Sequence, residues 1–387
     1  MLTATNYQTS KDFELSEFSA GEWLALKYVG FDAKNLEIPA EIDGKKITHI
    51  SSYFFEGNNT IENIKIANGI KSIGSRAFAS CENLKSVILP ETLERIDDSV
   101  FSDSGIEELH LPNSVNEIGC NLCYGCKKLN KVVLSDSLTE IPIYAFHNCK
   151  ELKYVTLPKK IKEIKRNAFS NCKIKYIDFP EGLEIIEESA FYQNEFEKII
   201  FPKSIKSIEK ESINSTTLKT VIILPGCEAS LGDSIFTKGK YWSNLTSVCI
   251  PASVTKIAQV FSEEAANYHE RIKRDEDGKI VRDAWGKEVT ELVGRNAGFR
   301  VNVSEKLTVY CESGSEIMSL AKRDKIKCSD YSTYLSANLD SIRKEIEFYV
   351  GSASIPASAQ AIINIINDSI NYVRGIATVF LNRFKNK

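Results

Sequence analysis

The 387-residue sequence lacks several features that mark common functional classes. Its 49 basic and 52 acidic residues give a net charge of only −3, so no global field would attract nucleic acid or an anionic membrane. Four histidines leave little material for histidine-based catalysis or a zinc site. There is also no glycine-rich phosphate-binding loop. These absences argue against a nucleic-acid-binding protein and leave no visible constellation of acid, base and nucleophile.

Long apolar runs are missing as well. No stretch of 18 or more uncharged apolar residues occurs, so no transmembrane segment is expected. The N-terminus has no basic region followed by an apolar one, so no signal peptide is predicted. On this interpretation the protein is cytoplasmic if the chain is complete, and otherwise secreted or on the cell surface with its leader removed.

An internal repeat of 22 or 23 residues is the strongest signal in the sequence. Its consensus, LxxVxLPxxLxxIxxxAFxxC, begins with apolar residues at alternate positions, which is the period of a half-buried strand. A proline then ends the strand by removing a hydrogen-bond donor, and a return segment follows. Stacked units of this kind share one continuous core and form a parallel ladder of strands. The equivalent aromatic positions are Phe55, Phe78, Phe101, Cys123, Phe146, Phe169, Phe191, Ile213 and Phe236.

The repeat resembles the BspA-like class of leucine-rich repeats. The pattern is clearest from Leu84 to Ile96, and the resemblance covers about residues 36–261. Residues 307–330 are similar to the closing repeat or cap of that family. The resemblance implies a leucine-rich-repeat solenoid with a parallel β-strand ladder on its concave face and short 3₁₀ or helical returns. It also implies a binding surface without catalysis, commonly in surface proteins of host-associated bacteria.

Three segments lie outside this repeat pattern. Residues 1–35 hold two short alternating runs, which predict a β-hairpin cap for the first edge of the ladder. Residues 262–306 break the period and form an insertion or a degenerate repeat. Residues 335–387 carry apolar residues spaced by four and three, which predict a C-terminal α-helical hairpin. This hairpin either packs on itself and the last repeat or mediates homo-oligomerisation or partner binding, through Ile363, Ile366, Ile370, Val373, Phe380 and Phe384.

The spacing of Cys120, Cys123 and Cys126 is that of a metal or iron–sulfur site. The repeat register argues against this, because Cys123 falls in the aromatic column and Cys126 in the last inward column. Cys120 falls at an exposed position, so the three side chains should point in different directions. We therefore expect no metal, no cofactor and no catalytic residue in these repeats.

The last inward column has its own explanation. A thiol or amide there can bond the loop backbone inside the turn. Free buried thiols in series are typical of a reducing compartment or an anaerobic source, and disulfides between turns are not expected. The residues of this column, called the cysteine row below, are Asn58, Cys81, Cys126, Cys149, Cys172 and Asn194.

The outward-facing strand positions form the candidate binding surface. Strand residues on either side of the central apolar one point away from the core, and several of them are tyrosine or aliphatic. Tyr154 and Tyr176 should lie side by side, as anchors in a mixed polar and apolar field. An alternative explanation is that β-branched residues simply favour strands. The candidate ligand-binding residues are Glu108, His110, Lys131, Val133, Tyr154, Thr156, Tyr176, Asp178, Lys198 and Ile200.

These observations favour a non-catalytic interaction module that binds a protein or peptide on its concave strand face, with the helical tail for a second contact or self-association. The alternative is a secreted or surface adhesin of a host-associated microbe. An enzyme with a site in residues 262–306 is less favoured, because no catalytic constellation is visible.

Overall fold

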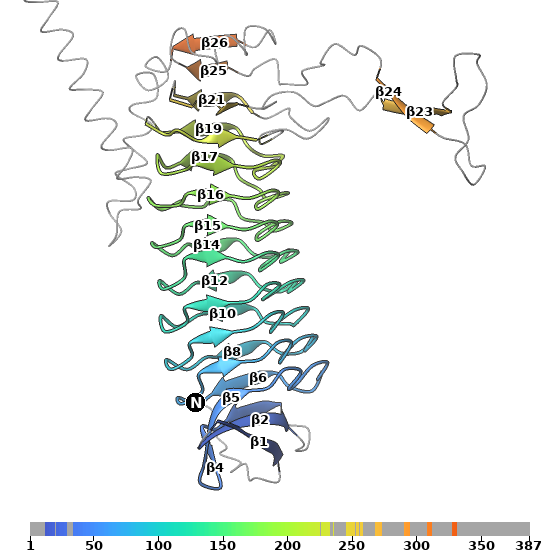
Figure 1. The fold of residues 1–387 in the computed structure, drawn as a ribbon, viewed down its shortest axis with the longest axis vertical. Helices are drawn as coiled ribbons and strands as arrows, with labels where there is room; N and C mark the ends of the chain where they lie inside the picture. The colour runs from blue at the N-terminus through green and yellow to red at the C-terminus, as the bar shows by residue number, and fades with distance from the viewer. Residues whose placement is uncertain are drawn as a thin grey trace, which may run out of the picture.

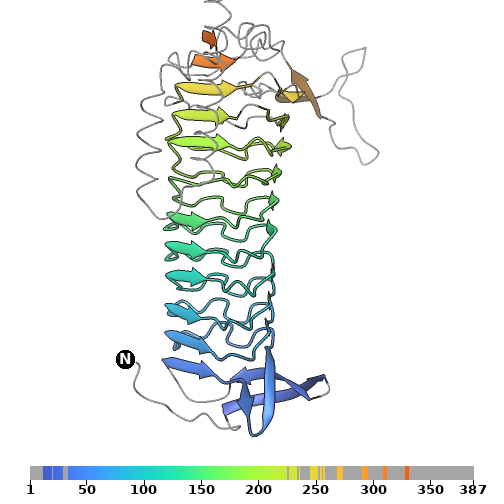
Figure 2. The same ribbon diagram turned by 90° about the vertical axis from the view of Figure 1, so that its left-hand side faces the viewer.

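The repeats stack turn upon turn into an elongated rod (Figure 1). This computed structural model describes residues 12–19, 21–28, 34–224, 226–232, 235, 245–251, 253–254, 256–257, 268–272, 290–294, 308–311 and 327–330. A view at right angles shows two columns of strands along two sides of the rod (Figure 2). In both views the stack runs nearly straight, so the side that carries the longer strands is close to flat, where the family resemblance implied a concave face.

The longer strands come from the first half of each repeat and pair in parallel and in register, so that Glu108 lies opposite Lys131 and Lys131 opposite Tyr154. This strand ladder has breaks, and the clearest one lies between β14 and β17, where residues 175–179 form no strand. Its members are β3 (Asn35–Ile38), β6 (Asn63–Ile66), β8 (Ser86–Ile88), β10 (Glu108–His110), β12 (Lys131–Val133), β14 (Tyr154–Thr156), β17 (Lys198–Phe201), β19 (Thr220–Ile223), β21 (Ser247–Ile250), β25 (Thr308–Cys311) and β26 (Lys327–Asp330).

The return segments form a second parallel ladder, and the described returns contain no helix. The sequence prediction of 3₁₀ or helical returns is therefore wrong. The short strands from β5 to β20 each end in a buried aliphatic residue such as Ile96, and β-branched side chains pack well in stacked strands. The members are β5 (Lys45–Ile50), β7 (Ser72–Ile73), β9 (Arg95–Ile96), β11 (Glu117–Ile118), β13 (Glu140–Ile141), β15 (Glu163–Ile164), β16 (Ile185–Ile186), β18 (Ser207–Ile208), β20 (Ser230–Leu231) and β22 (Lys256–Ile257).

Left-handed backbone conformations keep the rest of each return from becoming helical. Asn167 and Asn171 flank Phe169 and have φ angles of 55° and 56°, a region that asparagine tolerates better than most residues. Because residues of positive φ alternate with residues of negative φ, the N–H groups between them point along the rod. Phe169 N–H donates to the Ala190 carbonyl at 2.8 Å and Asn171 N–H to the Tyr192 carbonyl at 2.7 Å. The return is thus held by hydrogen bonds to the next turn.

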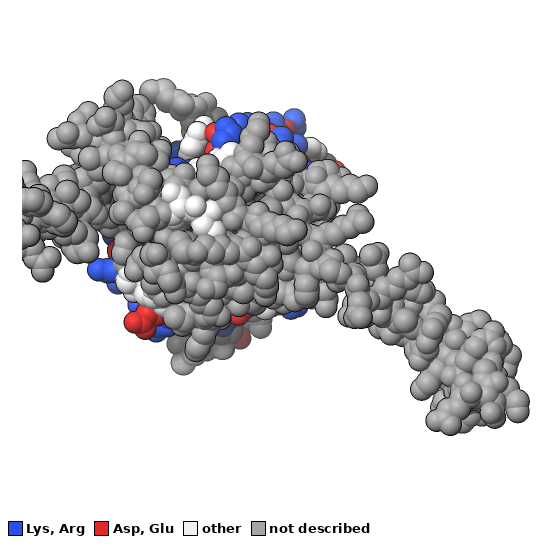
Figure 3. All heavy atoms as spheres, turned by 90° about the horizontal axis from the view of Figure 1, so that it is seen from above, with Lys and Arg blue, Asp and Glu red and all other residues white. Residues whose placement is uncertain are grey.

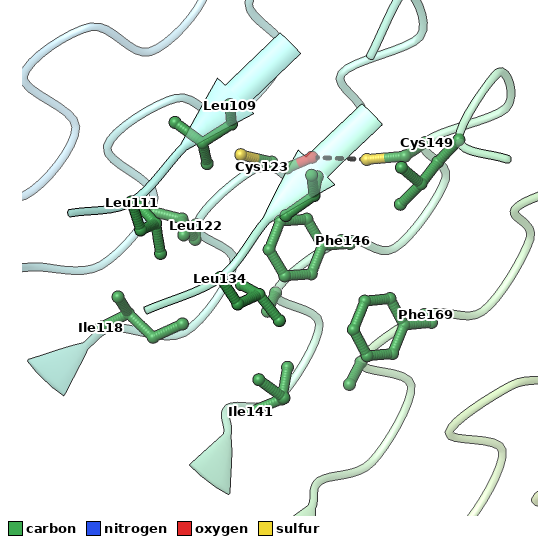
Figure 4. Packing of buried hydrophobic residues seen from close by; sticks show 14 of the residues in the cluster. Leu109, Leu111, Ile118, Leu122, Cys123, Leu134, Ile141, Phe146, Cys149 and Phe169 are labelled. Atoms are coloured by element: carbon green, nitrogen blue, oxygen red, sulfur yellow. Dashed lines mark hydrogen bonds between the residues drawn. The ribbon is translucent and has the colours of Figure 1, made fainter. Parts of the chain in front are cut away.

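The core is a set of side-chain columns that run the length of the rod. In the aromatic column, the rings of Phe146 and Phe169 stack with centroids 5.2 Å apart, and those of Phe169 and Phe191 at 5.3 Å. Figure 4 shows Phe146 and Phe169 in this arrangement, with Ile141 and Leu134 packed beside them. All column members within the described residues are buried, which confirms the predicted register. They are Phe55, Phe78, Phe101, Cys123, Phe146, Phe169, Phe191 and Ile213.

The N-terminal end of the second ladder is covered by a hairpin. β1 (Phe13–Ser19) and β2 (Glu22–Tyr28) pair antiparallel, and β2 continues in parallel onto β5. β4 (Glu41–Ile42) also pairs with β5, antiparallel. An open first edge is thereby occupied within the chain, which limits strand addition by other molecules.

Two predicted segments lie partly or wholly outside the described residues. Within residues 262–306 the structure describes an antiparallel pair, β23 (Tyr268–Ile272) and β24 (Thr290–Gly294). The predicted helical hairpin of residues 335–387, with the partner residues from Ile363 to Phe384, lies outside the described residues. In the part of the chain that is described, no helix has the length and apolarity needed to cross a membrane.

Ion pairs link successive turns at the surface. Glu62 accepts from Lys34 of the preceding turn at 2.9 Å and Lys85 of the following turn at 2.8 Å. Glu184 is bonded in the same way by Lys162 and Lys206. From above, the visible basic and acidic side chains lie next to each other at the margins of the rod (Figure 3). Exposed pairs contribute little each, but alternating signs favour one alignment of the turns.

The hydrogen bonds from Lys85 and Lys34 hold the pKa of Glu62 at about 2, below its ordinary value of 4.5. A carboxyl group with a lowered pKa stabilises the fold at pH values above its ordinary pKa of 4.5. That contribution is lost as the pH falls toward about 2.

The spacing of the turns is tight enough to exclude a methyl group at Gly105. A Cβ there would lie 2.1 Å from the carbonyl oxygen of Glu82, a backbone atom of the preceding turn. We expect Gly105→Ala to lower the free energy of unfolding by about 1–3 kcal/mol, because the two turns must move apart. Chemical denaturation would measure this change. Gly57→Ala is a control for the clash, because a Cβ at Gly57 meets no atom within 4 Å, although its φ of 72° adds backbone strain. A Gly105→Ala variant as stable as the wild type would contradict the steric explanation.

Candidate binding face

The candidate residues lie along one side of the rod, on the outer surface of the strand ladder from β10 to β17. We call this set of ten residues the strand face. Between them, inward-pointing residues such as Leu109, Val132 and Ile199 are each 1% exposed and fix the backbone against the core. The exposed members are Glu108, His110, Lys131, Tyr154, Thr156 and Tyr176. The half-buried members are Val133, Asp178, Lys198 and Ile200.

Tyr154 and Tyr176 are the most prominent side chains of the strand face. They are 67% and 66% exposed, whereas most aromatic residues of the described repeats are buried. The structure describes both residues and shows no ring contact between them, so the predicted side-by-side packing is not found. The reason lies in the ladder, because Tyr154 belongs to β14, whereas Tyr176 lies in residues 175–179, which form no strand. Each ring therefore keeps its surface available.

The outward-facing positions of the strand ladder are no longer exposed beyond β17. Ile222 of β19 and Cys249 of β21 occupy outward positions by the alternation of their strands, but they are only 4% and 0% exposed. Further down, Ile88 of β8 is 54% exposed. The open part of this side therefore reaches from β8 to β17, with the tyrosines in its upper half.

Two groups of surface residues were missed from the sequence. Lysines lie along the edge of the strand face beside the tyrosines. They come from successive turns, and only the stacking of these turns brings them together. On the return side, the His147 ring lies between Tyr124 and Tyr144, with centroids 5.2 and 5.3 Å away. His147 also bonds the Ser170 hydroxyl, and partial burial lowers the pKa of the imidazole. The repeat register was the available signal for both groups, because it places residues 22 or 23 apart side by side.

A family model for the BspA type leucine rich repeat region matches residues 33–130 and 116–241, with six copies. Together the two matched stretches cover more than half of the chain, and they coincide with the stacked turns. The chain belongs to the BspA-type leucine-rich repeat family. Proteins of this family are generally non-catalytic, and the repeat suggests a role in protein interaction or at a cell surface.

Solved structures of bacterial leucine-rich repeat proteins are also similar to this BspA-type chain. One is a leucine-rich repeat protein of T. pallidum, with 20% identity, a TM-score of 0.42, and 59% of this chain and 87% of that one covered. A leucine-rich repeat protein of Bacteroides ovatus has 21% identity and a TM-score of 0.47, over 64% and 74% of the two chains. A leucine-rich cell surface protein of Faecalibacterium prausnitzii has 17% identity and a TM-score of 0.45, over 64% and 89%. No curated protein matches the sequence.

The cysteine row of this BspA-type repeat serves the fold. The Cys149 thiol donates to the backbone carbonyl of Cys123 at 3.1 Å (Figure 4), and Cys172 donates in the same way to Phe146 at 3.2 Å. These two bonds join a turn to the preceding one. The predicted bonds inside a turn also occur, because Asn58 Oδ1 accepts from Ile61 N–H at 3.1 Å and Asn194 Nδ2 donates to the Phe191 carbonyl at 3.0 Å. Burial raises the pKa of the Cys149 and Cys172 thiols, and that of Cys81 to about 12. These three thiols are therefore protonated donors at neutral pH and poor nucleophiles.

The three cysteines with metal-like spacing do not share one environment. Cys123 and Cys126 are fully buried, and Cys120 is half-buried on the return. The cysteines from Cys81 to Cys249 are free thiols, and the described residues contain no group of three or more side chains able to hold a metal ion.

Proposed function

We propose that this BspA-type protein is a non-catalytic interaction module that binds a protein or peptide on its strand face between β10 and β17. The observation that carries the proposal is the exposure of Tyr154 and Tyr176, at 67% and 66%. Large aromatic side chains in such positions provide apolar contact area and a hydroxyl for hydrogen bonding at little entropic cost. The rigid core columns behind them hold the backbone of the face in place before a partner arrives.

The surroundings of the tyrosines support a mixed interface. Val133 and Ile200 add half-buried aliphatic surface, while Glu108, His110 and Thr156 supply exposed polar groups. Protein interfaces commonly combine a few aromatic anchors with a polar rim of this kind.

Replacing Tyr154 and Tyr176 together by serine should weaken partner binding by about 30-fold or more, because an aromatic anchor is typically worth at least 2 kcal/mol. The partner would be recovered by pull-down from the native source, and its dissociation constant measured with the purified full-length variants. The melting temperature should change little, because both side chains are mainly exposed.

Tyr53→Ser is the matched control. Tyr53 is 59% exposed but lies on the return side of the first turn, away from the strand face. Unchanged affinity in the double variant, or an equal loss in the control, would disprove the proposed face.

A further inference from the structure

A cluster of lysines surrounds the two exposed tyrosines. Residues 127–131, 150–154 and 173–176 lead into the strand ladder in three consecutive turns and contain seven lysines but a single glutamate. Apart from the half-buried Lys173, these lysines are exposed. We call the set the lysine–tyrosine patch, and its members are Lys127, Lys128, Lys131, Lys150, Lys153, Lys173, Lys175, Tyr154 and Tyr176.

Backbone hydrogen bonds place the three segments side by side. Lys153 N–H donates to the Asn130 carbonyl at 3.2 Å, and Lys173 N–H donates to the Leu152 carbonyl at 3.0 Å. Within the strands, Lys131 lies opposite Tyr154. Residues that are distant in the sequence therefore form one surface, with neighbouring turns about 4.8 Å apart.

The positive charge of the patch is only partly neutralised within the protein. Glu151 pairs with Lys173 at 2.7 Å and with Lys153 at 3.8 Å. Lys175 reaches Glu195 at 3.8 Å. Lys127, Lys131 and Lys150 have no ion-pair partner among the described residues. A surplus of positive charge remains beside the tyrosine rings.

Acidic residues border the patch on both sides along the rod. In the turn before it, Glu107 and Glu108 are exposed, and Glu108 lies opposite Lys131. In the turn after it, Glu195 and Glu197 occupy the positions that lysines hold inside the patch. The charge along this edge thus changes from negative to positive and back to negative, and the positive section spans three turns.

We propose that the lysine–tyrosine patch selects a protein partner that presents a short acidic segment next to an apolar or aromatic side chain. This inference rests on the proposed function and adds the chemistry of the ligand. Carboxylates would lie against the lysines, and the apolar side chain would cover the rings of Tyr154 and Tyr176.

The borders explain why a short protein segment fits better than a long polyanion. A nucleic acid or sulfated polysaccharide carries negative charge at every step and gains affinity from each phosphate or sulfate that is neutralised. Such a chain would run onto Glu107 and Glu108 at one end or Glu195 and Glu197 at the other, where like charges repel. A folded protein can present acidic residues at the centre and basic residues on both sides.

Selection of a displayed library of random short peptides on the full-length protein tests the inference. We expect the enriched peptides to combine Asp or Glu with an aromatic or aliphatic residue. Removing the charges of Lys127, Lys131 and Lys150 by substitution with glutamine should weaken their binding about tenfold, and raising the salt to about 0.5 M should have a similar effect. The matched control is the same substitution at Lys159, Lys160 and Lys203, three exposed lysines at the opposite ends of the strands.

The outcomes separate this inference from the proposed function. Enrichment of peptides without acidic residues that still require Tyr154 and Tyr176 would overturn the inference and leave the proposed function standing. Enrichment of peptides whose binding does not depend on either tyrosine would overturn the proposed function and the inference with it. Tight binding of heparin that requires the three lysines, with no acidic peptide enriched, would show that the patch binds a polyanion and would also overturn the inference.

Discussion

Replacing Phe169 by alanine should lower the free energy of unfolding by about 3–5 kcal/mol, because the ring is removed from the middle of a packed column. Phe169 is 0% exposed and stacks on Phe146 at 5.2 Å and on Phe191 at 5.3 Å. The truncation removes both ring contacts and leaves a cavity that the hydrogen-bonded turns on either side cannot close. Urea denaturation followed by circular dichroism would measure the change.

Phe169→Leu is the conservative companion to this variant. The aromatic column already holds Ile213 at an equivalent, fully buried position, so an aliphatic side chain is compatible with the turn. We expect leucine to cost clearly less than alanine, because more of the buried volume is kept. A near-wild-type stability of the alanine variant would mean that the column is not packed as the structure shows.

Replacing Asn194 by alanine should cost about 2–4 kcal/mol, which is the second largest effect we expect. The side-chain amide is 3% exposed and makes three hydrogen bonds to the backbone. Its Nδ2 donates to the carbonyls of Phe169 at 2.7 Å and Phe191 at 3.0 Å, and its Oδ1 accepts from Ile174 N–H at 3.1 Å. Alanine leaves these buried backbone groups without this partner.

Asn194→Cys distinguishes the hydrogen bond from the packing. Asn194 occupies the cysteine row, and Cys172 donates from the same position of the preceding turn to the carbonyl of Phe146. A cysteine at 194 should therefore restore the bond to Phe169 and recover part of the stability lost in the alanine variant. Equal losses in the two variants, measured by thermal unfolding under reducing conditions, would show that the donor is unimportant.

The ladder was predictable because the sequence repeats its core. The 22- or 23-residue spacing placed Phe78, Phe146 and Phe169 in one column, and the alternation around Val132 and Val155 placed Lys131 and Tyr154 on the outer surface. The returns were predicted wrongly because the spacing of Ile161, Ile164 and Ala168 also places apolar residues on one side of a helix. The signal against a helix was the recurrence of Asn and Ser at positions that adopt positive φ.

The lysine–tyrosine patch was missed for a different reason. The net charge of −3 describes the whole chain and hides the unequal distribution of charge along it. Lys127, Lys150 and Lys173 belong to different turns, and only the stacking of those turns makes them neighbours. The tyrosines could be assigned to the surface one by one, but their separation followed from the missing strand at residues 175–179.

The alternating ion pairs between turns constrain how such a rod can lengthen by duplication. Lys162, Glu184 and Lys206 lie in successive turns, and Glu184 bonds both lysines. Duplicating the single turn that carries Glu184 would set two glutamates side by side, a repulsive arrangement. Duplicating two adjacent turns would preserve the alternation of lysine and glutamate. Gene growth in this part of the chain is therefore least disruptive in steps of two repeats.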